Sequence, residues 1–179
     1  MLFSNDDIAA SLRALVAELV SVGAESTILV VGGAAIALQV GREGLTEDID
    51  TLHLPSPEVG KAAQRVALAK GWPETWLSDN AKMYDSHFHT DADWELLIED
   101  HGVIVCIAGP RLLLAMKLLA GRGRRDQTDI DRLLETLGIT SIEDAVSLFD
   151  HYYPTEVIKP NAMRQLESRF PAQSAPNTL

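Results

Sequence analysis

Residues 27–54, TILVVGGAAIALQVGREGLTEDIDTLHL, decide the fold of this chain. The stretch opens with the apolar run ILVV at residues 28–31, whose length and β-branched composition predict a buried strand. Gly32 and Gly33 follow directly, and the next residues, AAIAL, favour a helix. The order predicts a strand, a tight glycine turn and a helix N-terminus. Backbone N–H groups and the helix dipole at such an N-terminus favour a bound phosphate.

Two aspartates, Asp48 and Asp50, flank Ile49 later in the same stretch. Side chains alternate along a strand at ~3.3 Å per residue, so both carboxylates are expected on one face, about 7 Å apart. Such a pair favours a cation, and Mg²⁺ takes one or two carboxylates together with substrate phosphates. The alternative is that the two aspartates only cap and solvate an edge strand.

Three other motifs for nucleotides or cations do not fit these residues. A dinucleotide-binding fold needs G-x-G-x-x-G, where this chain has GGAAIA. A P-loop needs Gly-Lys followed by Ser or Thr, which occurs nowhere in the chain. An EF-hand loop that begins at Asp48 fails because apolar residues and a histidine occupy three of its defining positions.

The Gly-Gly pair followed by Asp-Ile-Asp resembles the signature of the nucleotidyltransferase superfamily, which has the DNA polymerase beta-like fold. The segment PRLLLAMKLLAGRGRRDQTDIDRLL at residues 110–134 resembles the second block of minimal nucleotidyltransferases of the AbiEii toxin type and related uncharacterised bacterial proteins. The likeness covers residues 27–137. It implies that a lysine and a following aspartate, here Lys117 and Asp126, complete the site.

The resemblance also implies a reaction and its participants. Asp48 and Asp50 would hold Mg²⁺, and Gly32 and Gly33 would approach the phosphates of an NTP. An NMP group would move to an RNA or protein acceptor, such as a tRNA end or a protein side chain, with release of pyrophosphate. A toxin–antitoxin role would add a cognate antitoxin or toxin as partner. The alternative is a catalytically inactive module of this type that binds such a partner.

The residues of the second block allow more than one reading. Lys117 falls beside the apolar stripe of its predicted helix, so it either snorkels to water or reaches the nucleotide phosphates. Asp126 lies on the apolar stripe of the next helix, as an ordinary first-turn charge or as an inward site residue, and Asp129 competes with it. The basic residues between them either solvate a helix end or form a patch for a triphosphate or RNA: Arg122, Arg124 and Arg125.

Many nucleotidyltransferases carry a third carboxylate on a later strand. Glu95 and Asp93 are the candidates, because the strand that begins at Trp94 is expected to lie beside the Asp-Ile-Asp strand. Glu95 would share a face with Leu97 and Glu99, which is also the pattern of a solvent-exposed edge.

Composition limits the protein class. The chain has 179 residues and a net charge of −11, which argues against broad non-specific binding to nucleic acid or membranes. No apolar run approaches the ~20 residues that span a bilayer. The N-terminus lacks the pattern of a signal peptide, and the single Cys106 lies in an apolar run. A cytoplasmic protein with a buried, reduced thiol is therefore expected.

The expected fold class is α/β in the α+β sense, with a small mixed sheet of the nucleotidyltransferase type and a C-terminal helical part. Residues 1–109 would form the core, residues 110–170 helices packed on it, and residues 171–179 a disordered tail. Further helices are predicted at residues 5–22, 57–70, 110–119, 126–137, 142–151 and 161–170, and a β-hairpin at residues 94–107. Residues 72–89 are interpreted as a loop with a short helix.

Overall fold

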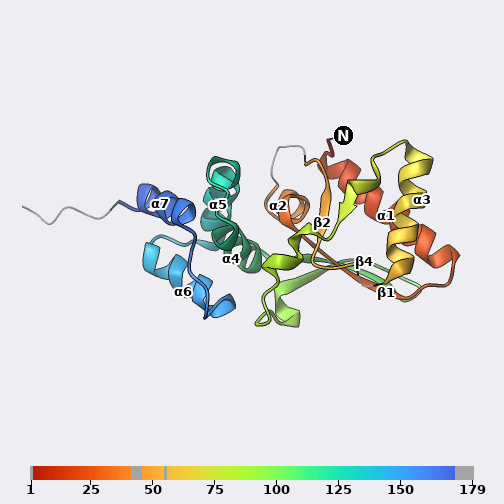
Figure 1. The fold of residues 1–179 in the computed structure, drawn as a ribbon. Helices are drawn as coiled ribbons and strands as arrows, with labels where there is room; N and C mark the ends of the chain where they lie inside the picture. Colours follow the sequence, from red (N-terminus) through yellow and green to blue (C-terminus); the bar gives the residue numbers. More distant parts are fainter. Residues whose placement is uncertain (1, 42–45, 55, 172–179) are drawn as a thin grey trace, which may run out of the picture.

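The computed structural model describes residues 2–41, 46–54 and 56–171. In these residues the chain is an α+β protein with one five-stranded mixed sheet and seven α-helices, which confirms the predicted fold class (Figure 1). Residues 172–179 of the predicted tail lie outside the described residues. No helix in the described ranges is both long enough and apolar enough to cross a bilayer.

The helices begin and end where caps and breakers predict. Ser4 caps the first helix and shares a capping box with Asp7, while Gly71 and Gly138 follow their helices with a left-handed backbone. The α-helices are α1 (Asn5–Ser21), α2 (Gly32–Val40), α3 (Pro57–Lys70), α4 (Pro110–Ala120), α5 (Arg124–Leu137), α6 (Ile142–Tyr152) and α7 (Pro160–Arg169).

The sheet has the strand order β3-β2-β1-β5-β4. Its strands are β1 (Ser26–Val31), β2 (Ile49–Thr51), β3 (Leu77–Ser78), β4 (Trp94–Asp100) and β5 (Val103–Ala108). The central pair β1 and β5 is parallel, as is the pair β2 and β3, and the other two pairs are antiparallel. The region read as a loop with a short helix, residues 72–89, contains β3 and two short 3₁₀ helices, η1 (Glu74–Trp76) and η2 (Asn80–Tyr84). A third 3₁₀ helix, η3 (Asp91–Asp93), follows this region.

The expectation that β4 lies beside β2 is wrong. The tight turn at His101 and Gly102 pairs β4 with β5, and the other side of β5 is taken by β1. β4 therefore forms one edge of the sheet, while β2 lies near the opposite edge between β1 and β3. The predicted hairpin is confirmed, but its place in the sheet depends on the β1–β5 pairing, which links residues far apart in sequence.

The sheet buries one set of alternating side chains. Ile28 and Val30 of β1 share a face with Val105 and Ile107 of β5, and all four are buried. Cys106 points to the opposite face and is half-buried rather than fully buried as predicted, and burial raises the pKa of its thiol. α1 contacts this sheet and α3 packs on α1.

The four C-terminal helices gather at one end of the molecule around α4 (Figure 1). α4 contacts α2, α5, α6 and α7, and therefore all but a few of its side chains are buried. α5 also contacts α2, so the helical part meets the sheet at the helix that begins with Gly32 and Gly33. The division of the chain at residue 109 stays a prediction.

Candidate active site

A pocket of about 310 Å³ opens where β2, the start of α2 and the start of α5 meet. Seven of the residues singled out in the sequence line it, although they come from three separate segments: Gly33, Asp48, Asp50, Lys117, Arg122, Arg125 and Asp129. Leu2, Thr46 and Glu47 complete the lining. The fold thus brings together residues of the glycine–aspartate stretch, residues 27–54, and of the segment at residues 110–134.

The glycine turn is fitted closely to Asp50. Gly32 has a φ of 66°, and a Cβ at this position would lie 2.9 Å from Oδ2 of Asp50. The other carboxylate oxygen of Asp50, Oδ1, accepts a hydrogen bond of 2.8 Å from Oγ of Ser78. The positive φ of the predicted glycine turn therefore falls on Gly32, and glycine at that position leaves the carboxylate of Asp50 in place.

The phosphate seat predicted from the sequence would lie at the start of α2. The helix begins at Gly32, directly after β1, and its N-cap residue, Val31, forms no side-chain cap hydrogen bond. Helix N-termini leave backbone N–H groups without intrahelical partners, and these groups attract anions. Gly33 forms part of the pocket wall, so the start of α2 borders the same space as Asp48 and Asp50.

The two aspartates form a concentrated negative charge. Asp48 directly precedes β2 and Asp50 lies within it, while Ile49 between them is fully buried. Burial, and then the charges of Asp50 and Glu47, raise the pKa of Asp48. β2 is also not an edge strand, which removes the reading that the two aspartates merely solvate an edge. Two crowded oxygen donors of this kind fit Mg²⁺.

Lys117 does not snorkel to solvent. Its Nζ lies 2.7 Å from Oδ1 of Asp126 and 2.8 Å from Oδ2 of Asp129, and its side chain is only 13% exposed. Both aspartates are buried and point inward from the beginning of α5. Asp126 also accepts a 3.1 Å hydrogen bond from the backbone N–H of Arg122. The choice between Asp126 and Asp129 therefore does not arise, because both carboxylates form an ion pair with Lys117.

The three arginines between α4 and α5 separate into two groups. Arg122 and Arg125 line the pocket, and their charges act on Asp48 in the direction that lowers its pKa. Neither forms a salt bridge within the part of the chain that the structure describes. Arg124 lines another groove, with Arg164 of α7. Arg122 and Arg125 thus bring positive charge to the pocket, and no salt bridge within the described residues neutralises it.

The candidates for a third carboxylate do not belong to this site. Glu95 lies on the exposed edge strand β4, at the opposite side of the sheet from β2. Asp93 accepts a hydrogen bond from the hydroxyl of Tyr152 and does not line the pocket. Within the described ranges, no group of three or more His, Cys, Asp or Glu side chains could hold a metal ion.

Ser78 and Tyr84 are two residues beside the site that sequence reasoning missed. Ser78 orients Asp50, and Tyr84 lines a smaller cavity beside the pocket. Both come from residues 72–89, where neither helical nor strand periodicity is present to reveal them. Comparison of the chain with protein-family models, with curated proteins and with solved structures found no match.

Proposed function

We propose that this protein binds an NTP with Mg²⁺ and transfers the NMP group to an RNA or protein acceptor, as a nucleotidyltransferase. The observation that carries the proposal is a single pocket that contains two crowded aspartates, a helix start after a glycine pair, and two arginines that form no salt bridge with the described residues. Each feature suits one part of a metal–triphosphate: the carboxylates suit the cation, and the other two suit the phosphates.

Asp48 and Asp50 would hold Mg²⁺, with Ser78 fixing the orientation of Asp50. The bound ion would supply charge neutralisation at the phosphates and orientation of the acceptor hydroxyl. Backbone N–H groups at Gly32 and Gly33 would receive phosphate oxygens, and Arg122 and Arg125 would neutralise phosphate charge. Because carboxylates repel a bare triphosphate, the aspartates also make binding depend on the cation.

Lys117 receives a different role from the one that the family resemblance implies. Its ammonium group is bound to Asp126 and Asp129, and it therefore ties the end of α4 to the beginning of α5. The loop between these helices carries Arg122, whose backbone N–H is held by Asp126. Lys117 would thus position the arginine loop, and its position in the pocket wall also brings its charge near a bound phosphate.

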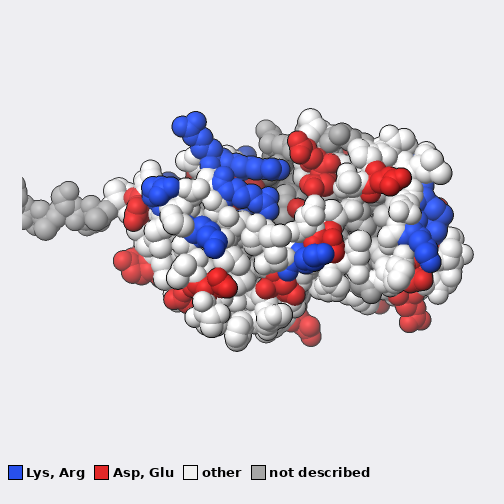
Figure 2. Space-filling model, viewed as in Figure 1, with Lys and Arg blue, Asp and Glu red and all other residues white. Residues whose placement is uncertain are grey.

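The acceptor would approach over the C-terminal helices. Residues 1–109 carry 6 Lys and Arg against 17 Asp and Glu, whereas residues 110–179 carry nine of each. Basic side chains gather over α5 and α7 in Figure 2. The groove there is lined by Arg124, Arg164 and amide side chains, a composition suited to an acidic acceptor.

A catalytically inactive module that binds a toxin or antitoxin partner is the second candidate. It is favoured because Glu95 and Asp93 lie outside the pocket, and because no group of three or more His, Cys, Asp or Glu side chains in the described ranges could hold a metal ion. Such a module would retain the pocket, and with it NTP binding, but would lack transfer.

Isothermal titration of each NTP in MgCl₂ tests the first step. Wild type is expected to bind at least one NTP, and Asp50→Asn is expected to lose Mg²⁺-dependent binding while it keeps its fold. The fold should persist because an asparagine oxygen can still accept the hydrogen bond from Ser78. Asp150→Asn, on the exposed surface of α6, is the matched control.

Incubation of wild type with labelled NTPs, Mg²⁺ and cell lysate tests transfer. Labelled RNA or protein supports the enzyme, and binding without any label supports the inactive module. A large loss of stability in Asp50→Asn would instead mean that Asp50 has a structural role, and the metal assignment would be withdrawn.

A further inference from the structure

A second, smaller cavity of about 40 Å³ adjoins the pocket. The two share Gly33, Asp50, Lys117 and Arg122 in their walls, so they form one continuous site. The remaining wall of the smaller cavity is chiefly apolar and aromatic: Ala81, Tyr84, Leu113, Met116 and Ala120, with Gly32. A polar pocket that continues into an apolar one matches a ligand that has a charged end and a flat apolar end.

The ring of Tyr84 is covered by a guanidinium group. The Cζ atom of Arg122 lies 5.6 Å from the ring centroid, in cation–π contact. A guanidinium plane and a nucleobase stack on an aromatic ring in the same way, so the arginine occupies the place that a base would take. Arg122 is exposed and also lines the larger pocket, so its side chain can leave the ring for the phosphates.

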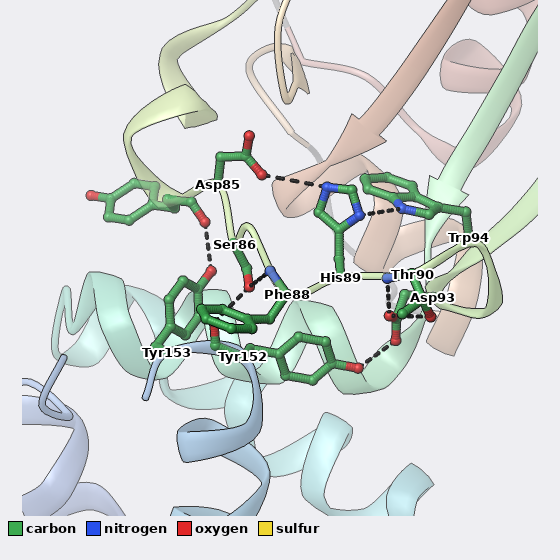
Figure 3. A network of polar contacts seen from close by, with 10 residues as sticks. Asp85, Ser86, Phe88, His89, Thr90, Asp93, Trp94, Tyr152 and Tyr153 are labelled. Atoms are coloured by element: carbon green, nitrogen blue, oxygen red, sulfur yellow. Dashed lines mark hydrogen bonds and ion pairs between the residues drawn. The ribbon is translucent and has the colours of Figure 1, made fainter. Parts of the chain in front are cut away.

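Hydrogen bonds tie the segment around Ser86 to the end of α6 (Figure 3). The hydroxyl of Tyr153 also donates a 2.5 Å hydrogen bond to the carbonyl oxygen of Tyr84. Oγ of Ser86 donates to the carbonyl oxygen of Tyr152 at 2.6 Å and accepts from the backbone N–H of Phe88. Ser86 and Tyr153 are buried. The ring is thus presented from a fixed segment, as a binding platform requires.

We propose that Tyr84 is the platform on which the base of the bound NTP stacks, while Arg122 moves from the ring to the phosphates. The inference rests on the proposed function for the identity of the ligand. It adds that the site recognises a nucleoside triphosphate rather than a triphosphate alone. Because stacking grows with the area of the base, ATP and GTP should bind more tightly than CTP and UTP.

Isothermal titration of ATP, CTP and inorganic tripolyphosphate in MgCl₂ separates base from phosphate. Tyr84→Leu is expected to weaken ATP binding about tenfold, because one stacked base contributes on that scale. Tripolyphosphate affinity should stay the same, and Tyr84→Phe should bind ATP as wild type does. Equal losses for ATP and tripolyphosphate, or no loss for either, would overturn the platform.

Two further measurements separate the loss of stacking on Tyr84 from a general loosening of the backbone around it. Tyr153→Phe removes the hydrogen bond to the Tyr84 carbonyl but keeps both rings, so it should weaken ATP binding less than Tyr84→Leu does and leave tripolyphosphate affinity unchanged. In wild type, the adenine H8 and H2 proton resonances should shift upfield on binding, as they do over an aromatic ring. Unshifted resonances in bound ATP would overturn the platform even if Tyr84→Leu did not fold.

The outcomes also distinguish this inference from the proposed function. If wild type binds ATP and tripolyphosphate but Tyr84→Leu changes neither, only the platform is wrong. If wild type binds neither ligand in Mg²⁺, the proposed function fails and the platform fails with it.

Discussion

Lys117 reaches Asp126 and Asp129 from the last turn of α4, and both carboxylates are 3% exposed or less. A lysine in this position neutralises two buried carboxylates. Breaking a buried ion pair by removing one member is far more costly than removing a surface lysine, because the remaining charge cannot regain its hydration. A change at Lys117 is therefore expected to affect both the stability of the fold and the pocket that this side chain lines.

Lys117→Met is expected to lower the free energy of unfolding by about 3–5 kcal/mol. A snorkelling lysine would lose under about 1 kcal/mol in the same variant, because the stem and its packing are kept. Urea unfolding followed by circular dichroism measures the difference. Adding Asp129→Asn to Lys117→Met should recover part of the loss, since it removes one of the two carboxylate charges that Lys117 neutralises. Full additivity of the two changes would argue against the ion pair.

Asp48 predicts a pH dependence. Burial and the charge of Asp50 raise its pKa, so the folded protein holds this proton more tightly than the unfolded chain. The resulting stability is fully present below the unfolded pKa of about 3.9 and is lost as pH rises through the higher folded pKa. Asp48→Asn should therefore be more stable than wild type at neutral pH, with an advantage that shrinks as pH approaches about 4.

Urea unfolding of both proteins at several pH values across this window provides the measurement. A variant that is less stable than wild type by the same amount at every pH would show that Asp48 serves as a structural hydrogen-bond acceptor.

At the scale of elements, the turn between β1 and α2 is both part of the fold and part of the pocket wall. Gly32 has a left-handed backbone, and Asp50 of the neighbouring strand occupies the space where a side chain would begin. The register that pairs Val31 with Asp50 produces this contact. A side chain at position 32 would consequently disturb both the turn and the carboxylate that is held by Ser78.

Gly32→Ala is expected to cost more than the roughly 1–2 kcal/mol of a left-handed non-glycine residue, because its Cβ also meets Asp50. Gly23→Ala is the matched control: φ is 65° there and no atom lies within 4 Å of an added Cβ. Thermal and urea unfolding of the two variants isolates the contact with Asp50 as their difference. Equal losses would mean that Asp50 moves aside freely.

On the scale of the whole molecule, the net charge of −11 arises entirely from residues 1–109. Self-repulsion of this kind destabilises a compact state and is screened by salt. The melting temperature is expected to rise from low to physiological concentrations of NaCl. A fall would show that favourable surface ion pairs outweigh the repulsion.

MgCl₂ offers a sharper form of the same measurement. At equal ionic strength it should raise the melting temperature of wild type above the NaCl value, because a ligand that binds only the folded state stabilises it. Asp50→Asn should show no such excess. An equal excess in both proteins would indicate that Mg²⁺ binds elsewhere on the acidic surface.

The sequence by itself determined the elements whose signals are local. The β1–glycine–α2 unit, the helix start at Ser4 and the hairpin of β4 and β5 follow from short-range patterns of apolar residues, caps and turns, and the structure contains all of them. The spacing of Asp48 and Asp50, two residues apart, is a local signal of the same kind. Lys117 and Asp126 could be named as partners only through the family resemblance, and the structure joins them.

Only the tertiary structure decided which strands meet and which charges are paired. β4 lies far from β2 because the parallel pairing of β1 with β5 links residues about 75 positions apart, and no local pattern encodes it. β3 is too short to show a period, so Ser78 could not be foreseen beside Asp50. Periodicity placed Lys117 near an apolar stripe, but whether its charge meets water or carboxylates depends on the packing of α5 against α4.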